Sequence, residues 1–426
     1  MKKTFSILLM AVVCLFCCSR ANAHHVMCFG EFSIDGLDYA YFDDTKKSVY
    51  VTFAHASHLK GTKVVIPDTV EWLNVKYPVK TVASEAFHHC PEVDSIIVSP
   101  NIEFINHKAF TGTKWENNLP DGPVYLGNHL YKYNGAMPEE FHYNIEPGTK
   151  SVTERAFEGY TNLREINFPA SVKRLHVNVF EGCTNLKEIT IYSKDAPADF
   201  AKETFFESDG YGHEVINKSV KDANLFIPKG SLDSYTRAGY HLVVKSIREM
   251  EFDPFSFEVI SEKEMTAKVS ANRMVELSGE ISIPETTDIN GNPYKITTIP
   301  ADAFAGYEKL TKVTLPTSIS EIGERAFMGC KALKESNIPN GVTAIPAEVF
   351  ADCESLVTVA IPRTVETIDK TAFRNCNNLD EATQESIVKD YINAIYIIGA
   401  IIVILLILFL IKRIKRGKKA PKICEE

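Results

Sequence analysis

The stretch LPTSISEIGERAFMGCKALKESNIP, residues 315–339, spans slightly more than one unit of the repeat that decides the fold. Its phenylalanine, Phe327, belongs to a series with a constant spacing of 23 residues. A fixed period in the twenties predicts a solenoid of stacked units rather than the core of a globular enzyme. The phenylalanines that keep this spacing form three groups: Phe304, Phe327, Phe350 and Phe373; Phe87 and Phe110; Phe157 and Phe180.

The apolar residues inside one unit predict its local structure. Leu310 is followed by an apolar residue three positions on and by Leu315 two positions later, and a step of two is typical of a strand. Pro316 then closes the strand, because proline cannot donate to a ladder. A second apolar pair, Ile319 and Ile322, predicts a short strand, and the Ala-Phe segment before glycine predicts a short helical turn. One unit cannot bury both its leucine row and its phenylalanine, so we expect these residues to form the core between stacked units.

These residues carry a resemblance to a known family. The order and spacing of Leu315-Pro316, Ile319, Ile322, Ala326-Phe327, Cys330 and Leu333 resemble the BspA-like leucine-rich-repeat family. Three flanking pieces are similar to the family's opening segment, its usual insert and its block end: residues 63–67 with 77–80, 115–122 with 124–127, and 225–231 with Tyr235. The resemblance covers most of residues 28–379. It implies a leucine-rich-repeat solenoid, mainly β with short helical turns, that binds other proteins, often at cell surfaces, including host matrix or other cells.

The period also indicates how the chain is divided. It is interrupted between Phe110 and Phe157, which are 47 residues apart, and a second opening segment resembling the first begins near Phe252. We therefore expect two repeat blocks. The predicted parts are a signal peptide (1–23), an N-terminal cap (24–80), the first block (81–250) with an insert (111–149) and a closing segment (225–250), the opening of the second block (251–300), the second block (301–379), a linker (380–391), a transmembrane helix (392–411) and a basic tail (412–426).

Both ends of the chain carry targeting signals. Residues 1–23 combine a basic start, an apolar stretch and an Ala21-Asn22-Ala23 cleavage site, which is typical of a secretory signal. Cys17 follows a phenylalanine too large for a lipobox, so we favour simple cleavage over lipidation. Residues 392–411 are long and apolar enough to span a bilayer, and the basic residues after them favour a cytoplasmic C-terminus. We expect a single-pass protein with extracytoplasmic repeats, at the cell surface or in the periplasm.

The ten cysteines do not indicate a disulfide framework. Five occupy one repeat position, where Tyr160 and Tyr307 stand in other units, so we interpret it as a packing position with reduced, buried thiols. Cys28 falls outside this pattern and is either paired or free. The repeat cysteines are Cys90, Cys183, Cys330, Cys353 and Cys376.

No motif for catalysis or cofactor binding is present, so we predict that the chain is not an enzyme and needs no cofactor. His55 with His58, and His88 with His89, lack ligand partners at zinc spacing, so we interpret them as surface residues rather than metal ligands. Cleavage after Ala23 leaves His24 at the N-terminus, where it could chelate copper, but a repeat scaffold does not resemble a copper oxygenase. The net charge of −9 disfavours nucleic acid and favours a basic protein partner, although solubility alone also explains it.

The strand residues between the inward-facing ones share one surface of a leucine-rich-repeat solenoid. We predict that this surface is either a ligand-binding face or a solvated sheet face. Two functions remain open: adhesion or recognition of a protein, and structural scaffolding of the cell envelope. The candidate binding residues are Glu165, Asn167, Glu188, Thr190, Lys312, Thr314, Glu335, Asn337 and Thr358.

Overall fold

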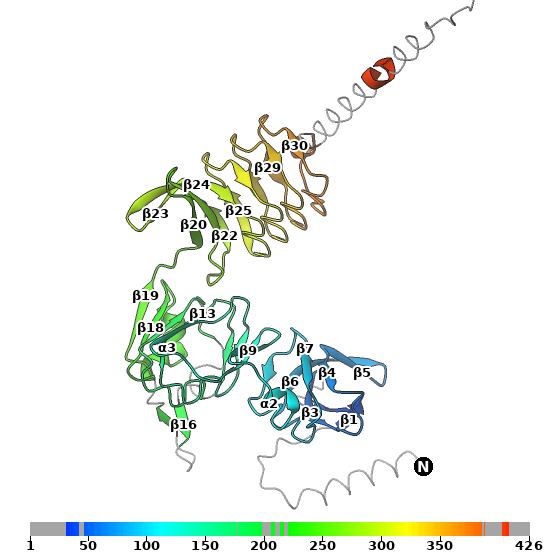
Figure 1. Ribbon diagram of the computed structural model, residues 1–426, viewed down its shortest axis with the longest axis vertical. Coiled ribbons are helices and arrows are strands. Elements are labelled where there is room, and N and C mark those ends of the chain that lie inside the picture. Colours follow the sequence, from blue (N-terminus) through cyan, green and yellow to red (C-terminus); the bar gives the residue numbers. More distant parts are fainter. Residues whose placement is uncertain are drawn as a thin grey trace, which may run out of the picture.

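The 23-residue period organises the whole computed structural model (Figure 1). The part of the chain that the structure describes comprises residues 31–41, 47–176, 178–197, 206–208, 214–216, 220–385, 387 and 403–408. It consists mainly of strands with a few short helices, which agrees with the predicted leucine-rich-repeat fold. Its buried apolar residues form three clusters, within residues 32–131, 130–244 and 269–376.

The N-terminal region forms a sheet in the order β1-β2-β3-β6-β5, with β8 paired to β6. The hairpins β1–β2, β2–β3 and β5–β6 are antiparallel, whereas β6 runs parallel to β3 and β8. A separate parallel pair joins β4 to β7. The bounds are β1 (Glu31–Ile34), β2 (Leu37–Tyr41), β3 (Val49–Ala54), β4 (Lys63–Ile66), β5 (Thr69–Trp72), β6 (Val75–Val82), β7 (Ser95–Val98) and β8 (Phe104–Ile105).

The middle region contains a five-stranded parallel sheet, β11-β13-β15-β18-β19, and a smaller sheet, β14-β12-β10-β9. The predicted insert at 111–149 contains α2, β9, β10 and β11, and β11 is the first strand of the parallel sheet. The bounds are α2 (Lys114–Asn117), β9 (Gly122–Leu126), β10 (His129–Asn134), β11 (Phe141–Asn144), β12 (Ser151–Val152), β13 (Leu163–Phe168), β14 (Arg174–Leu175), β15 (Glu188–Ile191), β16 (Phe206–Ser208), β17 (Glu214–Ile216), β18 (Asn224–Pro228), α3 (Leu232–Arg237), the 3-10 helix η1 (Tyr240–Leu242) and β19 (Ser246–Met250).

The C-terminal region is the most regular part, and Figure 1 shows its rungs stacked side by side. Its long strands form the parallel sheet β22-β25-β27-β29, while β20, β21, β23 and β24 form a sheet that β26 extends. The bounds are β20 (Phe255–Ser261), β21 (Thr266–Ala271), β22 (Gly279–Ser282), β23 (Thr286–Ile289), β24 (Asn292–Ile299), β25 (Leu310–Thr314), β26 (Glu321–Ile322), β27 (Glu335–Asn337), β28 (Ala344–Ile345), β29 (Thr358–Ala360) and β30 (Thr367–Ile368).

The phenylalanines of successive rungs stack on one another. The ring centroids of Phe304 and Phe327 are 5.3 Å apart, those of Phe327 and Phe350 5.4 Å, and those of Phe350 and Phe373 5.5 Å, with nearly parallel planes. Offset stacks of this kind stabilise beyond the burial of their area. The backbone joins the same rungs, because the Phe327 amide donates to the carbonyl of Val349 in the next rung at 2.9 Å. The predicted role of these residues as core is confirmed.

The Ala-Phe segment forms consecutive hydrogen-bonded turns rather than a helix. The Cys330 amide donates to Phe327 O at 3.3 Å, which closes a turn of four residues. The residue two before Phe304, Phe327 and Phe350 has a positive φ although it is not glycine: 58° at Asp302, 56° at Arg325 and 56° at Glu348. A positive φ is uncommon for such side chains. At Arg325 the left-handed backbone directs the amide to Ala347 O in the next rung, 3.1 Å away.

The repeat cysteine position is a hydrogen-bonding position as well as a packing one. Cys330 Sγ donates to Phe304 O at 3.2 Å, and Cys353 Sγ donates to Phe327 O at 3.2 Å. Tyr160, which occupies the same slot, donates its hydroxyl to Tyr133 O at 3.1 Å. All five repeat cysteines are free and buried, as predicted, and burial raises the pKa of the Cys330 thiol to about 12. The hydroxyl of Tyr160 therefore makes the same kind of bond to the preceding rung as the cysteine thiols do.

The last long strand is capped by the segment that follows it. The Val359 amide of β29 donates to Thr383 Oγ1 at 3.2 Å, and Thr358 Oγ1 donates to Asp380 Oδ2 at 2.7 Å. Asp380 also accepts from the Thr383 amide at 2.8 Å, as expected at the start of the helical turn 381–385. This polar segment satisfies edge groups of β29 without the closing motif found after β15.

Several sequence predictions lie outside the described residues. These are the signal peptide, His24, Cys28, the basic tail and all of the predicted transmembrane helix except residues 403–408. Those six residues are helical, and their apolar side chains are exposed. Within the described residues, no helix is both long enough and apolar enough to cross a membrane.

Ser336 marks a weak rung of the C-terminal sheet. It is in register with Val313 on β25 and Val359 on β29, and its buried hydroxyl has no hydrogen-bond partner among the described residues. Ser336→Val should raise the free energy of unfolding by about 1–2 kcal/mol, because it removes an unsatisfied polar group and adds apolar contact. Urea denaturation measures this difference. Thr314→Val, at an exposed position, is the control, and an equal gain there would contradict the explanation.

His129 is fully buried in the middle region, with its Nδ1 2.6 Å from Ser151 Oγ. Burial, helped by the charge of Lys150, lowers its pKa from 6.5 to about 4. The unfolded chain therefore binds a proton at a higher pH than the folded chain. The contribution of the neutral His129 side chain to the free energy of unfolding is complete above pH 6.5 and is lost as the pH falls towards 4.

We expect the free energy of unfolding to fall by about 3 kcal/mol across this interval on account of His129. His129→Asn should flatten that part of the pH profile, measured by urea denaturation at several pH values. The exposed His241→Asn should leave the profile unchanged. An unaltered profile in His129→Asn would show that this group does not titrate in the folded protein as described.

Candidate functional site

The candidate site is the outward face of the two parallel sheets. In β13, Leu163, Ile166 and Phe168 are buried, while Glu165 and Asn167 between them are half-buried on the outer surface. The same alternation recurs in β25, where Val313 is buried and Thr314 exposed. Parallel pairing without a shift then aligns equivalent outer side chains across neighbouring strands.

In the middle region the register aligns two acidic residues. Glu165 pairs with Glu188, and Asn167 pairs with Thr190. Thr190 is only 9% exposed, although the sequence placed it on the binding face. Its in-register neighbour on β18 is Phe226, and a large ring beside a small side chain removes it from solvent. Thr190 therefore adds little to the exposed surface.

A strand from the predicted insert completes this face. His142 on β11 is in register with Glu165, and its Nδ1 lies 2.8 Å from Glu165 Oε2. Asn167 Nδ2 donates to Glu165 Oε1 at 2.9 Å and to Asn144 Oδ1 at 2.7 Å. The hydrogen bond from His142 is the main cause of a lowered pKa at Glu165. Glu165 is thus held as an oriented carboxylate, and Glu188 beside it is exposed.

In the C-terminal region the predicted residues divide into two kinds. Glu335 is exposed and pairs with Lys312 Nζ at 2.7 Å, and Thr314 is exposed next to them. Asn337, in contrast, bonds to both the amide and the carbonyl of Leu315, at 2.8 and 2.9 Å, and Thr358 belongs to the cap formed with Asp380. Asn337 and Thr358 therefore stabilise the rungs.

Sequence reasoning missed several residues on these faces. His142 and Asn144 lie on β11, which falls in the predicted insert, and Arg248 lies exposed on β19 in the closing segment. The alternation Phe141-His142-Tyr143-Asn144 is a strand signal that could have revealed the first two. Glu280 on β22 is in register with Lys312.

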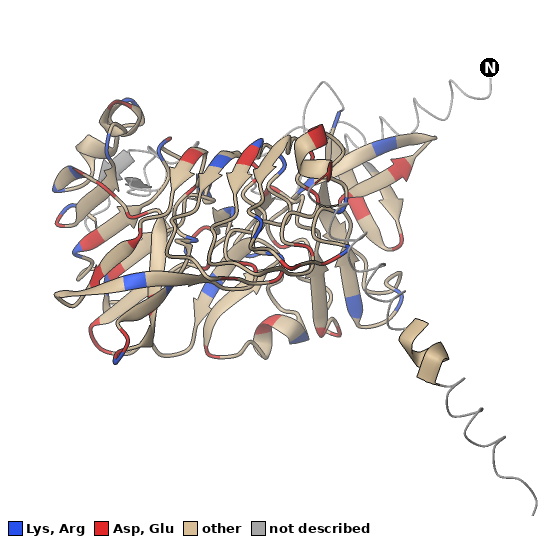
Figure 2. Cartoon of the chain, turned by 90° about the horizontal axis from the view of Figure 1, so that it is seen from above, with Lys and Arg blue, Asp and Glu red and all other residues tan. Residues whose placement is uncertain are grey.

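The charge on these surfaces is mixed. Figure 2 shows acidic and basic residues interspersed along the strands and loops. Among the described residues, no group of three or more His, Cys, Asp or Glu side chains is arranged to hold a metal ion. His55 Nε2 instead lies 2.8 Å from Asp38 Oδ2, and the rings of His88 and His89 contact each other at 5.0 Å.

The repeats define a leucine-rich-repeat protein. The sequence profile described as the BspA type leucine rich repeat region matches in six copies, over residues 67–187, 139–222 and 285–396, which is more than half of the chain. The protein therefore belongs to the BspA type leucine-rich-repeat family. Leucine-rich-repeat proteins commonly bind other proteins.

Several solved structures are similar to this chain. A leucine rich cell surface protein from Faecalibacterium prausnitzii A2-165 is 18% identical over 84% of this chain and 89% of that chain, with a TM-score of 0.27. A leucine-rich repeat protein from Bacteroides capillosus ATCC 29799 is 28% identical over 30% and 95%, with a TM-score of 0.27. The leucine rich repeat protein of T. pallidum is 15% identical over 85% and 96%, with a TM-score of 0.22. No curated protein matches the chain.

Proposed function

We propose that this chain is a recognition protein that binds another protein through the outward faces of its parallel sheets. The observation that carries the proposal is the alignment of outward-facing polar side chains by the repeat register, with Glu165 beside Glu188 and Lys312 beside Glu335. Repeat proteins use such extended, regular surfaces for binding. The carboxylates of the middle sheet favour a basic partner.

Glu165→Lys combined with Glu188→Lys should abolish binding of a basic probe, because it replaces two aligned carboxylates with cations. Poly-L-lysine is the probe, and binding is measured by isothermal titration calorimetry. The matched control is Glu262→Lys with Glu264→Lys, which makes the same charge change in an exposed turn. Equal losses in both double variants would indicate net charge alone and contradict the proposal for this face.

We propose further that two repeat blocks are displayed outside a membrane by a helix over residues 392–411. The support is the run of 20 residues in which only Asn393 and Tyr396 carry polar groups, followed at once by basic residues, together with the secretory signal at residues 1–23. Exposure of all six described side chains of this run agrees with a helix that needs an apolar surrounding. The gap between the clusters ending at Val244 and beginning at Val269 agrees with two blocks.

Protease shaving of intact cells tests the display. With an antibody against residues 255–379, we expect loss of signal without permeabilisation, because the repeats then lie outside the cell. Cytoplasmic marker proteins must remain intact as the control. Protection until the outer envelope is opened would place the repeats in a periplasm and favour scaffolding of the envelope instead.

A further inference from the structure

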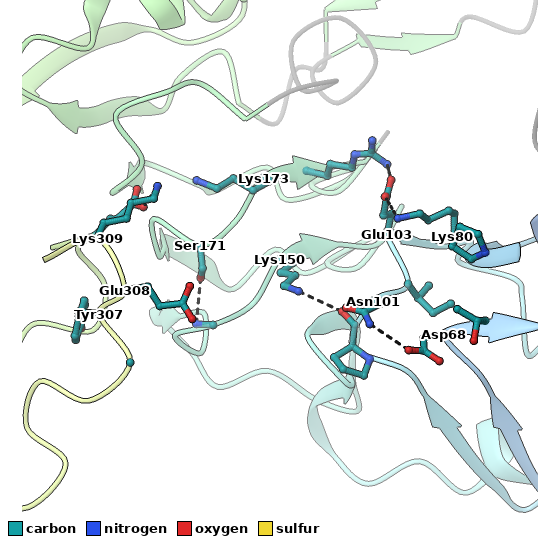
Figure 3. A pocket seen from close by; sticks show the side chains of 18 of the residues that line it. Asp68, Lys80, Asn101, Glu103, Lys150, Ser171, Lys173, Tyr307, Glu308 and Lys309 are labelled. Carbon is teal, nitrogen blue, oxygen red and sulfur yellow. Dashed lines mark hydrogen bonds and ion pairs between the residues drawn. The ribbon is translucent and has the colours of Figure 1, made fainter. Parts of the chain in front are cut away.

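A large groove lies where the three regions of the protein meet. Its volume is about 1020 Å³, and its walls come from residues 68–103, 148–174 and 276–309. Figure 3 shows Lys150, Lys173 and Ser171 on one wall, with Tyr307, Glu308 and Lys309 across from them. This volume is at the upper end of that of small-molecule pockets, so the groove has room for a short polymer segment.

Three lysines of the groove, Lys80, Lys150 and Lys173, occupy one repeat position, and the last two stand directly before the short strands β12 and β14. The Lys173 amide donates to Lys150 O at 2.8 Å, and the Glu103 amide donates to Lys80 O at 2.7 Å, which identifies equivalent positions in successive rungs. In the C-terminal region the same cross-rung bond joins Ser320 to Thr297. The other rungs of that region have Thr343 and Glu366 at this position. Lysine therefore occupies this position in three of the rungs that line the groove, whereas Glu103 occupies it in a fourth.

Two of these lysines have no carboxylate partner. Lys80 Nζ is 2.6 Å from Glu103 Oε1, and Lys309 is paired with Glu276. Lys150 Nζ donates only to Pro100 O at 3.2 Å and Lys173 Nζ only to Ala170 O at 2.9 Å, with no acidic group in ion-pair distance among the described residues. Their rungs are neighbours, so both unpaired cations lie on one wall of the groove, where they favour an anionic ligand.

Two further carboxylates of the walls already have partners: Asp68 accepts from Asn101 Nδ2 at 3.4 Å, and Glu308 is paired with Lys331. The apolar wall residues indicate the kind of anion. Pro78, Pro100 and Tyr307 give the groove apolar contact surface, and Tyr307 is the only aromatic residue among those that line it. A polysaccharide is held largely by stacking of sugar rings on several aromatic faces, which this groove does not provide. In an extended peptide, side chains two residues apart point the same way about 6.5 Å from each other, which matches two lysines with flexible stems.

We propose that this groove binds an extended acidic segment of another protein, with two of its carboxylates paired to Lys150 and Lys173. The apolar side chains of the segment pack against Pro78, Pro100 and Tyr307. This site is separate from the sheet faces and binds an acidic ligand rather than a basic one. The proposal therefore does not depend on whether those faces bind a basic partner.

Poly-L-glutamate is the probe for this site, titrated into the purified full-length protein at low ionic strength. Lys150→Gln with Lys173→Gln should weaken its binding about tenfold, because two exposed ion pairs are lost. Lys221→Gln with Lys245→Gln removes the same charge outside the groove and should leave the affinity within about twofold. Equal affinities for the two double variants, or no binding of the probe to the unaltered protein, would overturn the proposal.

Labelling of lysine amines in the unaltered protein provides a test that does not depend on folding of a variant. Bound poly-L-glutamate should protect Lys150 and Lys173 from acylation, while Lys221 and Lys245 react at an unchanged rate, as read by mass spectrometry. Unprotected Lys150 and Lys173 in the presence of bound probe would contradict the site. Binding and protection by heparin, but not by poly-L-glutamate, would overturn the protein segment in favour of a sulfated polysaccharide.

Discussion

The stacking of one phenylalanine ring on the next is the contact on which the rest of the C-terminal solenoid depends. Phe304, Phe327 and Phe350 are each fully buried, and no single rung has enough apolar surface to bury its own ring. The amides of these residues donate forward to the next rung, and the cysteine thiols donate back to the preceding one. Because apolar and polar contacts both run between rungs, each rung is stable only beside its neighbours.

Register between rungs also determines how a binding surface arises. When a side chain recurs every 23 residues on parallel strands, the equivalent residues of successive rungs form a column on the surface. Glu165 and Glu188 form such a column on the long strands. Lys150 and Lys173 form another before the short strands, where it faces a groove. The framework is the same in both places, and only the identity of the exposed residues makes one acidic and the other basic.

Much of this architecture follows from the sequence, because ring and leucine positions have to repeat if rungs are to stack. The period predicted the rungs and the buried cysteine slot. It did not predict the left-handed backbone at Asp302, Arg325 and Glu348, since the bonds that hold it come from the neighbouring rung. The lysine column was missed as well. The interval of 47 positions from Phe110 to Phe157 hides the equivalence of Lys80 and Lys150, and only the fold places their rungs in one groove.

Amide hydrogen exchange, resolved residue by residue, tests the central claim most directly. If the rungs are stable only through their neighbours, the amides of Phe304, Phe327 and Phe350 should be strongly protected and should become exchangeable together as urea is added. Each donates to the following rung at 2.7–2.9 Å, so loss of one contact exposes the next. Exchange of these amides as fast as that of surface loops, or at unrelated free energies, would contradict the account.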